Sequence, residues 1–413
     1  MSLIRRMAGI AGAATLAFTV TSSTGAAAVA AQPQPVIFVG SNWAGTVDVI
    51  RPAGDYQRLG QINVVPDLDQ RMMEIYTDPA RLAYFLLIRM LVGEGHDQLV
   101  DDMYSSADGR LLVASRPSLA DVVAIDTRSG ELVWRFRVDG QRSDHMALSP
   151  DGKHVAVSAS TGNVVHVLDV ATGKEVGRFP SGDSPHENVY SPDGERIYHA
   201  SIGLVYTPLD QPAFDTTKGQ RVFQVVDAST FDVLERVDLR EKLDAAGHHE
   251  LSSAIRPMAH TPDERFFYFQ LSFFHGFVEY DRQTGTITRV ASLPNHVPDM
   301  PREQYVNDSA HHGIAMNRTG SKLCVAGTMD DYAAIVSRKT LDHRIVADRA
   351  DVGGKPYWAT TSADGGKCYV SWSGADQISV FSYRSEREIA RVDVGDHPQR
   401  IREGVLPAGW RSP

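Results

Sequence analysis

Short runs of alternating hydrophobic and polar residues, separated by turn-forming residues, recur along most of the chain. One run spans residues 153–158, and another spans residues 164–170 after a small polar turn. Such alternation is typical of strands with one buried face, and the Gly, Asn, Asp and Pro residues between the runs are typical of tight turns. The pattern predicts antiparallel strands joined by short connections.

A turn of the type Ser149-Pro150-Asp151-Gly152 marks each repeating unit. A second turn, such as Ala171-Thr172-Gly173-Lys174, precedes a further strand. Each unit therefore predicts a four-stranded antiparallel meander. The third residue of the first turn, or its equivalent in a degenerate copy, marks six units with a smallest spacing of 42 residues, at positions 108, 151, 193, 263, 319 and 364.

A seventh unit is predicted from the two ends of the repeating region. Residues 36–41 resemble the strand that follows a missing turn, whereas residues 398–401 resemble an innermost strand with nothing after it. Pairing these two segments closes a ring and removes the free sheet edges that an open array would expose. The sequence therefore predicts an all-β fold, a seven-bladed β-propeller of four-stranded blades over residues 31–413.

Residues 1–30 are predicted to be a secretory signal peptide. Arg5 and Arg6 precede an apolar stretch over residues 7–20, and a tract of small residues ends in Ala28-Val29-Ala30. The stretch is too short for a membrane span, and no later stretch reaches the roughly 18 apolar residues that a span requires. We expect a secreted or periplasmic protein, exported by the Sec or the Tat route, without membrane insertion.

The charge balance narrows the choice of partners. The chain has 41 basic and 51 acidic side chains, which give a formal net charge of −10. No long-range field therefore attracts nucleic acid or anionic lipid. We expect a monomer that binds a small molecule and has no nucleic-acid partner.

Two segments carry a resemblance to a known family. Residues 153–176 (KHVAVSASTGNVVHVLDVATGKEV) and 369–380 (YVSWSGADQISV) are similar to the YVTN-repeat, or YncE-like, seven-bladed propellers. Relatives of that scaffold include exported binding proteins, the heavy subunit of methylamine dehydrogenase, lactonases and streptogramin-type lyases. The resemblance implies the scaffold for nearly the whole mature chain and leaves the chemistry open.

Missing motifs argue against several other classes of protein. No Trp-Asp dipeptide ends a repeat, which argues against a WD40 propeller. Residues 124–134 resemble a tryptophan-docking repeat of quinone-dependent alcohol dehydrogenases, but this motif occurs once. There is no Gly-x-Ser-x-Gly nucleophile elbow and no glycine-rich phosphate loop. We therefore expect neither a nucleotide nor a quinone cofactor.

Four insertions depart from the minimum repeat, and all four fall on the face of the ring where the innermost strands start. We call this the top face. Long loops on one face predict a pocket there. Within the first insertion, apolar residues at helical spacing predict a helix over residues 79–92, which is either a lid or a helix packed on the rim. The insertions lie near residues 51–104, 203–221, 239–256 and 293–311.

Aligning the innermost strands on their turns predicts a polar ring at the mouth of the central channel. This ring is either a solvated funnel or a functional site, and its histidines favour a site. Seven residues before the turn position stand Asp101, Asp144, His186, Arg256, His312 and Tyr357. Six residues before it stand Asp102, His145, Glu187, Pro257, Gly313 and Trp358, and the closing strand contributes Gln399 and Arg400.

Histidine binds metals as neutral imidazole and serves as a general acid or base near neutral pH. The predicted catalytic residues are His186, Glu187, His312, Asp144 and His145.

The expected cofactor is one transition metal ion (zinc, copper, iron, nickel or manganese) rather than calcium, which prefers oxygen ligands. Its predicted ligands are His186, His312 and one of His248 or His249. Only one residue of an adjacent pair is expected to reach the ion, because neighbours on a strand face opposite ways. Glu187 or Asp144 would be a further ligand or the base.

A second set of residues is suited to binding an organic substrate. Arg256 and Arg400 are predicted to clamp a carboxylate or phosphate, with Arg402 as a further candidate. Tyr357 and Trp358 are predicted to contact the substrate. For each aromatic residue, packing between blades is the alternative. Further candidates for an aromatic wall are Trp43, Phe273 and Phe274.

Two functions follow from these residues. In the first, the protein is an exported enzyme that moves a proton on a small organic substrate, as a lyase, isomerase or lactonase, with or without a metal. In the second, it is a non-catalytic exported propeller that binds a small molecule, a peptide or a partner protein. The first is favoured because paired histidines beside carboxylates supply acid/base groups that binding alone does not need.

Cys324 and Cys368 are predicted to lie on second strands of consecutive blades, on faces that touch. Export favours a disulfide. A disulfide, however, needs Cα atoms about 4.4 to 6.8 Å apart, whereas packed sheets lie about 10 Å apart. We therefore expect two buried free thiols rather than a disulfide.

Overall fold

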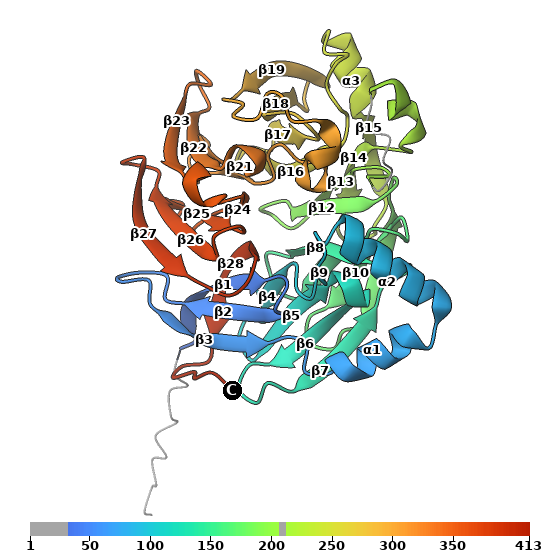
Figure 1. The fold of residues 1–413 in the computed structure, drawn as a ribbon, viewed down its shortest axis with the longest axis vertical. Coiled ribbons are helices and arrows are strands. Elements are labelled where there is room, and N and C mark those ends of the chain that lie inside the picture. The colour runs from blue at the N-terminus through green and yellow to red at the C-terminus, as the bar shows by residue number, and fades with distance from the viewer. Residues whose placement is uncertain (1–31, 206–211) are drawn as a thin grey trace, which may run out of the picture. The chain divides into compact units, whose positions relative to one another are not determined.

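The computed structural model describes residues 32–205 and 212–413, so the predicted signal peptide lies outside the described residues. From Pro33 onward the chain forms seven four-stranded antiparallel sheets arranged as the blades of a ring (Figure 1). The predicted seven-bladed β-propeller is confirmed. Among the described residues, no helix has the length and apolar character needed to cross a membrane.

Six blades are each made from four strands that are consecutive in the chain. Their bounds are β4 Met103–Ser105, β5 Leu111–Arg116, β6 Asp121–Asp126, β7 Leu132–Arg137; β8 Ser143–Leu148, β9 His154–Ala159, β10 Val164–Asp169, β11 Glu175–Pro180; β12 Pro185–Tyr190, β13 Arg196–Ser201, β14 Val222–Asp227, β15 Val233–Asp238; β16 Ile255–His260, β17 Phe266–Leu271, β18 Gly276–Asp281, β19 Thr286–Ser292; β20 Ile314–Met316, β21 Lys322–Gly327, β22 Tyr332–Ser337, β23 His343–Asp348; and β24 Pro356–Thr361, β25 Lys367–Trp372, β26 Gln377–Ser382, β27 Arg387–Asp393.

The seventh blade joins the two ends of the described chain. Its strand order is β28-β1-β2-β3, so the late strand is innermost and the early strands lie outside it. Strand β28 pairs antiparallel with β1, with Val39 opposite Ile401 and Phe38 opposite Arg402. The predicted closure is therefore confirmed, and it leaves the ring without an unpaired inner strand. The bounds are β1 Gln34–Ser41, β2 Thr46–Ile50, β3 Arg58–Asn63 and β28 Pro398–Leu406.

The repeated turn is held by its own side chains. In the turn that follows β8, Ser149 Oγ donates to Asp151 Oδ1 over 2.6 Å, and the same oxygen accepts from the Lys153 backbone N–H over 3.1 Å. Gly152 has φ = +72°, a conformation that costs residues with a Cβ more than it costs glycine. These requirements explain why the turn motif recurs wherever the first strand of a blade returns as the second.

Within the described residues, the insertions contain three α-helices: α1 Leu68–Tyr76, α2 Pro79–Leu91 and α3 Leu239–Ala245. The Asp78 side chain caps α2 by accepting from the backbone N–H groups of residues 80 and 81, and Pro79 supplies a first helical position that needs no N–H partner. Phe85 and Ile88 form its buried face. The helix predicted over residues 79–92 is confirmed. Short 3₁₀ segments are η1 Pro117–Leu119, η2 Pro212–Thr217, η3 Arg302–Gln304, η4 Val306–Asp308, η5 Thr328–Asp330 and η6 Ala350–Val352.

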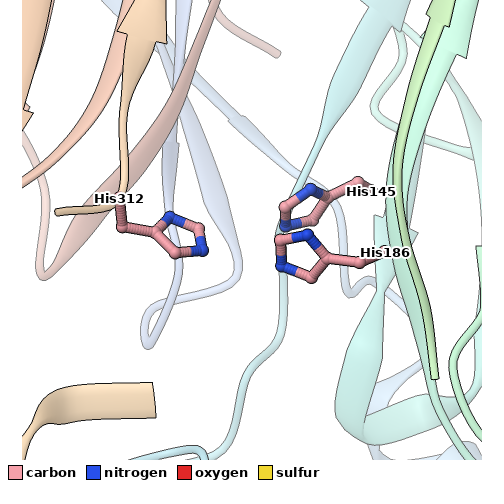
Figure 2. Close-up of side chains that lie close together, drawn as sticks. All are labelled: His145, His186 and His312. Atoms are coloured by element: carbon pink, nitrogen blue, oxygen red, sulfur yellow. The ribbon is translucent and has the colours of Figure 1, made fainter. Parts of the chain in front are cut away.

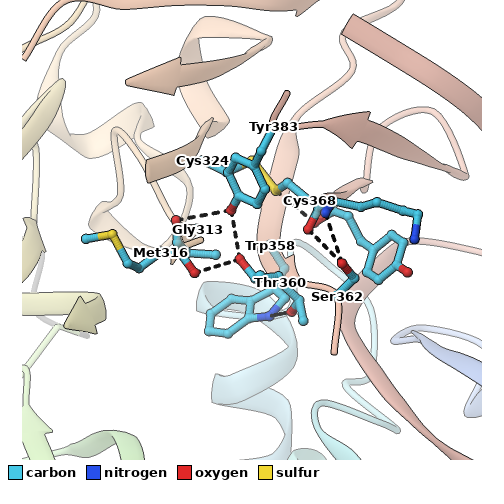
Figure 3. Close-up of a disulfide and its surroundings, with 12 residues drawn as sticks. Gly313, Met316, Cys324, Trp358, Thr360, Ser362, Cys368 and Tyr383 are labelled. Atoms are coloured by element: carbon cyan, nitrogen blue, oxygen red, sulfur yellow. Dashed lines mark hydrogen bonds between the residues drawn. A yellow bond between two sulfur atoms is a disulfide. The ribbon is translucent and has the colours of Figure 1, made fainter. Parts of the chain in front are cut away.

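The prediction of two free thiols is wrong. Cys324 in β21 and Cys368 in β25 form a disulfide with a Cα–Cα distance of 6.4 Å, and Figure 3 shows Tyr383 beside it. Blades radiate from the ring axis, so facing second strands lie closer together than the sheets of a parallel sandwich. The bond joins two consecutive blades across a sequence separation of 44 residues. A loop of that length corresponds to a stabilisation of about 4 kcal/mol in the chain-entropy model.

Candidate functional site

Three histidines from different blades meet inside the ring. His145 lies on β8, His186 on β12, and His312 just before β20. Their ligand nitrogens lie within 4.8 Å of one another, and the residues are only 3%, 4% and 1% exposed. Figure 2 shows His145 and His186 next to each other, with His312 facing them from the opposite side. We call these three residues the inner histidine cluster.

Local backbone irregularity brings these side chains together. The pairing of β8 with β9 shifts register between Ser143 and Met146, and that of β12 with β13 shifts between Pro185 and Glu187. Such shifts turn side chains away from the regular alternation of a strand. His145 stands six residues before its turn position and His186 stands seven residues before its own, yet both side chains reach the inner histidine cluster.

Two of the three imidazoles have a ring nitrogen without a partner. The Nδ1 atoms of His186 and His312 are buried and make no hydrogen bond. His145 Nδ1 lies 2.6 Å from Glu187 Oε2, so these two atoms share a proton. Burial, reinforced by neighbouring positive charge, lowers the pKa of all three histidines well below the ordinary value. The cluster is therefore neutral at neutral pH, which is the form that binds metal ions.

The carboxylates around the cluster differ in their partners. Burial raises the pKa of Glu187 to about 8, against the opposing effects of Arg400 and Arg402. Asp144 is tied to Arg142 Nη1 at 2.7 Å and accepts from Ser160 Oγ at 3.0 Å, which points to a structural role.

Asp101 belongs to the predicted polar ring and was not among the predicted catalytic residues, yet its surroundings are those of a base. Burial raises its pKa to about 6, helped by the charges of Asp144 and Asp102 and opposed by Arg400. Its Oδ2 atom is buried and has no hydrogen-bond partner. The signal that could have identified it was its register position, which it shares with His186 and His312.

The predicted substrate-binding residues also converge here. Arg400 is fully buried, and its guanidinium carbon lies 3.5 Å from the ring centroid of Trp358. The Tyr357 and His312 ring centroids are 4.3 Å apart. Arg256 is buried and donates from Nε to Ser272 Oγ over 2.9 Å. These four predicted residues therefore surround the inner histidine cluster.

The insertions cover the site on the top face. A cavity of about 30 Å³ lies among the three histidines, Asp101 and Arg256. Val92, Val205 and Asn307, which come from three different insertions, also line it. The predicted top-face pocket is therefore a small, partly open cavity with room for about two water molecules.

A wider channel opens on the opposite face, among the turns that follow the innermost strands. Its volume is about 560 Å³, and its walls include Glu187, Trp358 and Arg402. Arg402 makes two hydrogen bonds to Asp102, of 2.9 and 2.8 Å. Glu187 thus lines the open channel and at the same time contacts His145 of the inner histidine cluster.

The structure does not bring His248 and His249 to the cluster. They follow α3, where their side chains are 33% and 74% exposed. His249 Nδ1 lies 2.9 Å from Asp244 Oδ1, and His248 Nδ1 lies 3.6 Å from Glu250 Oε1. The position assigned to one of them as a ligand is occupied by His145, whose approach depends on the bulge in β8.

The other predicted aromatic residues also lie elsewhere. Trp43 is stacked between His96 and His397, at 3.8 Å from each ring centroid. Phe273 packs edge-on against Tyr305 at 5.7 Å. Phe274 packs against the hydrophobic core of its blade. These contacts match the alternative to substrate binding, namely packing of the aromatic rings within the scaffold.

A second buried group joins two neighbouring blades and was not predicted. Asp330 Oδ2 is 2.6 Å from His275 Nδ1 and 2.8 Å from His311 Nε2. The Tyr305 hydroxyl is 2.9 Å from His275 Nε2. We call His275, His311 and Asp330 the interblade network. No sequence motif links Asp330 to the two histidines.

Comparisons with known proteins agree on the propeller and stop short of a family. A family model described as "Outer membrane protein assembly factor BamB" matches residues 93–224, less than half of the chain. No match was found among curated proteins. Among solved structures, the chain is similar to Kuenenia stuttgartiensis hydrazine synthase, with a TM-score of 0.53 and 14% identity over 72% of this chain and 87% of that one. A likeness at that identity shows the fold alone.

Proposed function

We propose that this protein is an exported propeller enzyme that holds one transition metal ion on His145, His186 and His312. It acts on a small organic substrate by acid/base chemistry of the lyase, isomerase or lactonase type. One observation carries the proposal: three neutral imidazoles converge on a small polar cavity, and two of them have buried nitrogens without partners. Buried polar atoms normally have partners, so a ligand that accepts their lone pairs completes the site.

The ligand set suits a catalytic metal. Three protein ligands with one open position are typical of catalytic zinc sites, whereas structural sites use four. A metal held there would polarise a substrate carbonyl or activate a water molecule. Glu187, whose pKa is raised to about 8, would lose its proton when the ion binds; it would then accept the Nδ1–H of His145 and so fix the ring with Nε2 toward the ion. Imidazole ligands favour zinc, copper, iron or nickel over calcium.

Asp101 is the proposed base. Asp101 lines the cavity, its Oδ2 has no partner, and a pKa of about 6 leaves it ionised at neutral pH while keeping it basic. In a lyase or isomerase reaction it would take the proton from the carbon next to the substrate carbonyl. The C–H electron pair would move into the carbonyl group, whose oxygen gains the negative charge.

Export and the monomeric state belong to the same proposal. The predicted signal peptide and the YVTN-type repeats support export, as does the partial match to a family described as an outer membrane protein assembly factor.

The open channel of about 560 Å³ supports a second candidate function, non-catalytic binding of a small molecule. A propeller that only binds would retain its ligand after all bound metal is removed.

Metal analysis of the purified protein is the direct test. We expect about one transition metal ion per chain in the wild type, and loss of that ion in His186→Ala. The matched control is His343→Ala, because His343 is exposed on β23. Its metal content should equal that of the wild type. Equal metal content in His186→Ala, or a wild type that binds no added zinc, cobalt or copper, would refute the proposed centre.

A further inference from the structure

Two arginines beside the inner histidine cluster lack the hydrogen bonds expected of a buried guanidinium. Arg400 is fully buried, and none of its three side-chain nitrogens has a hydrogen-bond partner. Arg256 is 2% exposed, and its Nη2 atom has no partner. The carboxylates paired with them are too distant for a hydrogen bond: Asp101 lies 3.6 Å from Arg400 and Asp308 lies 3.7 Å from Arg256.

Two other arginines, Arg116 and the partly buried Arg402, show what a well-bonded guanidinium looks like in this fold. Arg116 is also fully buried, and it makes two hydrogen bonds to Asp121, of 2.7 and 2.8 Å, and one to the Val64 carbonyl, of 3.1 Å. Arg402, two residues after Arg400 on β28, is held by Asp102 through both Nε and Nη2. Arg400 therefore differs from Arg116 and Arg402 in making no hydrogen bond to the described residues, while Arg256 bonds through Nε to Ser272 Oγ and leaves Nη2 unpaired.

An anion of defined size and shape would complete these two groups. Leaving buried guanidinium donors unpaired is costly, and the planar fork of arginine matches the two oxygens of a carboxylate. Arg256 lines the cavity of about 30 Å³ together with His186 and His312. Arg400 lies one register position along the innermost strands, against Trp358 and Asp101. The cavity has room for a head group of about three heavy atoms and for little else.

We propose that this cavity binds the carboxylate group of a small organic acid, held by Arg256 in the cavity wall and supported by the unpaired charge of Arg400, 3.6 Å from the lining residue Asp101. The enzyme's substrates are then small carboxylic acids, a substrate class that rests on the proposed function. The anion site itself rests on the two arginines and the cavity, so it exists with or without a metal ion. Acids of the size of formate or acetate fit within the cavity, whereas an aromatic acid such as benzoate does not.

The test is titration with sodium formate in a chloride-free buffer, followed by calorimetry, on metal-free and metal-loaded protein. We expect saturable binding of one formate per chain in the wild type. Arg256→Gln and Arg400→Gln should each weaken binding at least tenfold. Arg318→Gln is the control, because Arg318 is exposed at the mouth of the wide channel and carries the same charge outside the cavity. Its formate affinity should stay within twofold of the wild type.

Further variants keep the test decisive if a glutamine variant fails to fold. Arg256→Lys and Arg400→Lys retain the charge and remove the fork, so they should fold and still bind formate more weakly. Unchanged formate affinity in the lysine and glutamine variants, or benzoate binding as tight as formate binding, would overturn the proposal. So would a wild type without saturable formate binding in either metal state. Formate binding by protein that takes up no metal would uphold the anion site and refute the proposed metal centre.

Discussion

The inner histidine cluster and the interblade network look alike by proximity and differ in their hydrogen bonding. Each contains three buried groups whose ligand atoms lie within 4.8 Å of one another. In the interblade network, the Asp330 carboxylate already accepts from two imidazoles. In the inner cluster, the carboxylates of Glu187 and Asp144 lie near His145, and among the described residues none bonds to two of the three rings. The Nδ1 atoms of His186 and His312 have no partner, and neither has Nδ1 of His311 in the interblade network. Proximity alone therefore does not distinguish the two groups; the carboxylate that already bonds to two imidazoles in the interblade network does.

The contrast is sharpest at two adjacent residues. His311 bonds to Asp330, whereas His312 faces His145 and His186. Neighbours along an extended segment point in opposite directions, so one dipeptide serves both groups. His311 is held by the scaffold, and the same bond fixes the backbone that carries His312.

The largest expected effect comes from substituting His312, and substituting its neighbour His311 serves as the comparison. His312→Ala should reduce metal affinity on the order of 1000-fold, about 4 kcal/mol, because one of three protein ligands is lost. Its melting temperature, measured without metal, should stay within a few degrees of the wild type. His311→Ala should retain the metal and melt earlier. Titration with cobalt(II), followed by its visible absorption, measures the affinity. The opposite pattern, with metal lost only in His311→Ala, would place the ion in the interblade network.

The next largest effect is expected at the centre of the interblade network. Asp330→Ala should lower the free energy of unfolding by about 3 kcal/mol, because two buried imidazoles and the backbone N–H of His296 lose their common acceptor. Metal content should not change. Urea unfolding followed by tryptophan fluorescence measures the loss. Stability equal to that of the wild type would show that the network does not hold the two blades together.

A smaller effect is expected from the residue behind His145. Glu187→Gln should weaken metal binding by about 10 to 100-fold, because an amide holds the His145 ring less firmly than a carboxylate does. His312→Ala should exceed this loss in the same cobalt titration. Glu195→Gln is the matched control, because Glu195 is exposed in the turn before β13. Asp144→Asn tests the other nearby carboxylate, whose Oδ1 lies 3.6 Å from His145 Nε2. A larger loss in Asp144→Asn would make Asp144 the carboxylate that supports the metal.

The sequence predicts the scaffold almost completely, because turn spacing and strand alternation are local properties. The ring closure follows from the same reasoning, since two incomplete units can only complete each other. Within the site, the register of the innermost strands predicts His186 and His312 correctly as neighbours. Their orientation relative to His311 follows from simple alternation.

What the sequence did not predict depends on departures from regular geometry. His145 was predicted as a catalytic residue but not as a metal ligand, because it joins the cluster through a register shift in β8 that no residue pattern indicates. The disulfide between Cys324 and Cys368 forms because wedge-shaped packing brings facing strands closer than the sheet spacing assumed from sandwiches. Asp330 lies at the end of η5 and meets His275 and His311 only because two neighbouring blades pack against each other.

The smallest expected effect is a pH dependence that belongs to the interblade network alone. Burial acts to raise the pKa of Asp330, but hydrogen bonds from His275 and His311 outweigh it and lower the pKa to about 2. The groups that face this carboxylate are those two imidazoles, with Tyr305 bonded to His275 behind them. Because the pKa is lower in the folded state than in the unfolded chain, the ionised carboxylate stabilises the fold by about 2 kcal/mol above pH 4. That stabilisation is lost as the pH falls toward 2.

Asp330→Asn removes this titration and leaves a side chain of the same size. The difference in unfolding free energy between wild type and Asp330→Asn should therefore shrink by about 2 kcal/mol between pH 5 and pH 2. Urea unfolding at intervals of half a pH unit measures it, and the exposed Asp351→Asn should follow the wild type throughout. A constant difference over this range would mean that Asp330 is not ionised in the folded protein. The interblade network would then be held by neutral hydrogen bonds, and its contrast with the inner histidine cluster would rest on geometry rather than on charge.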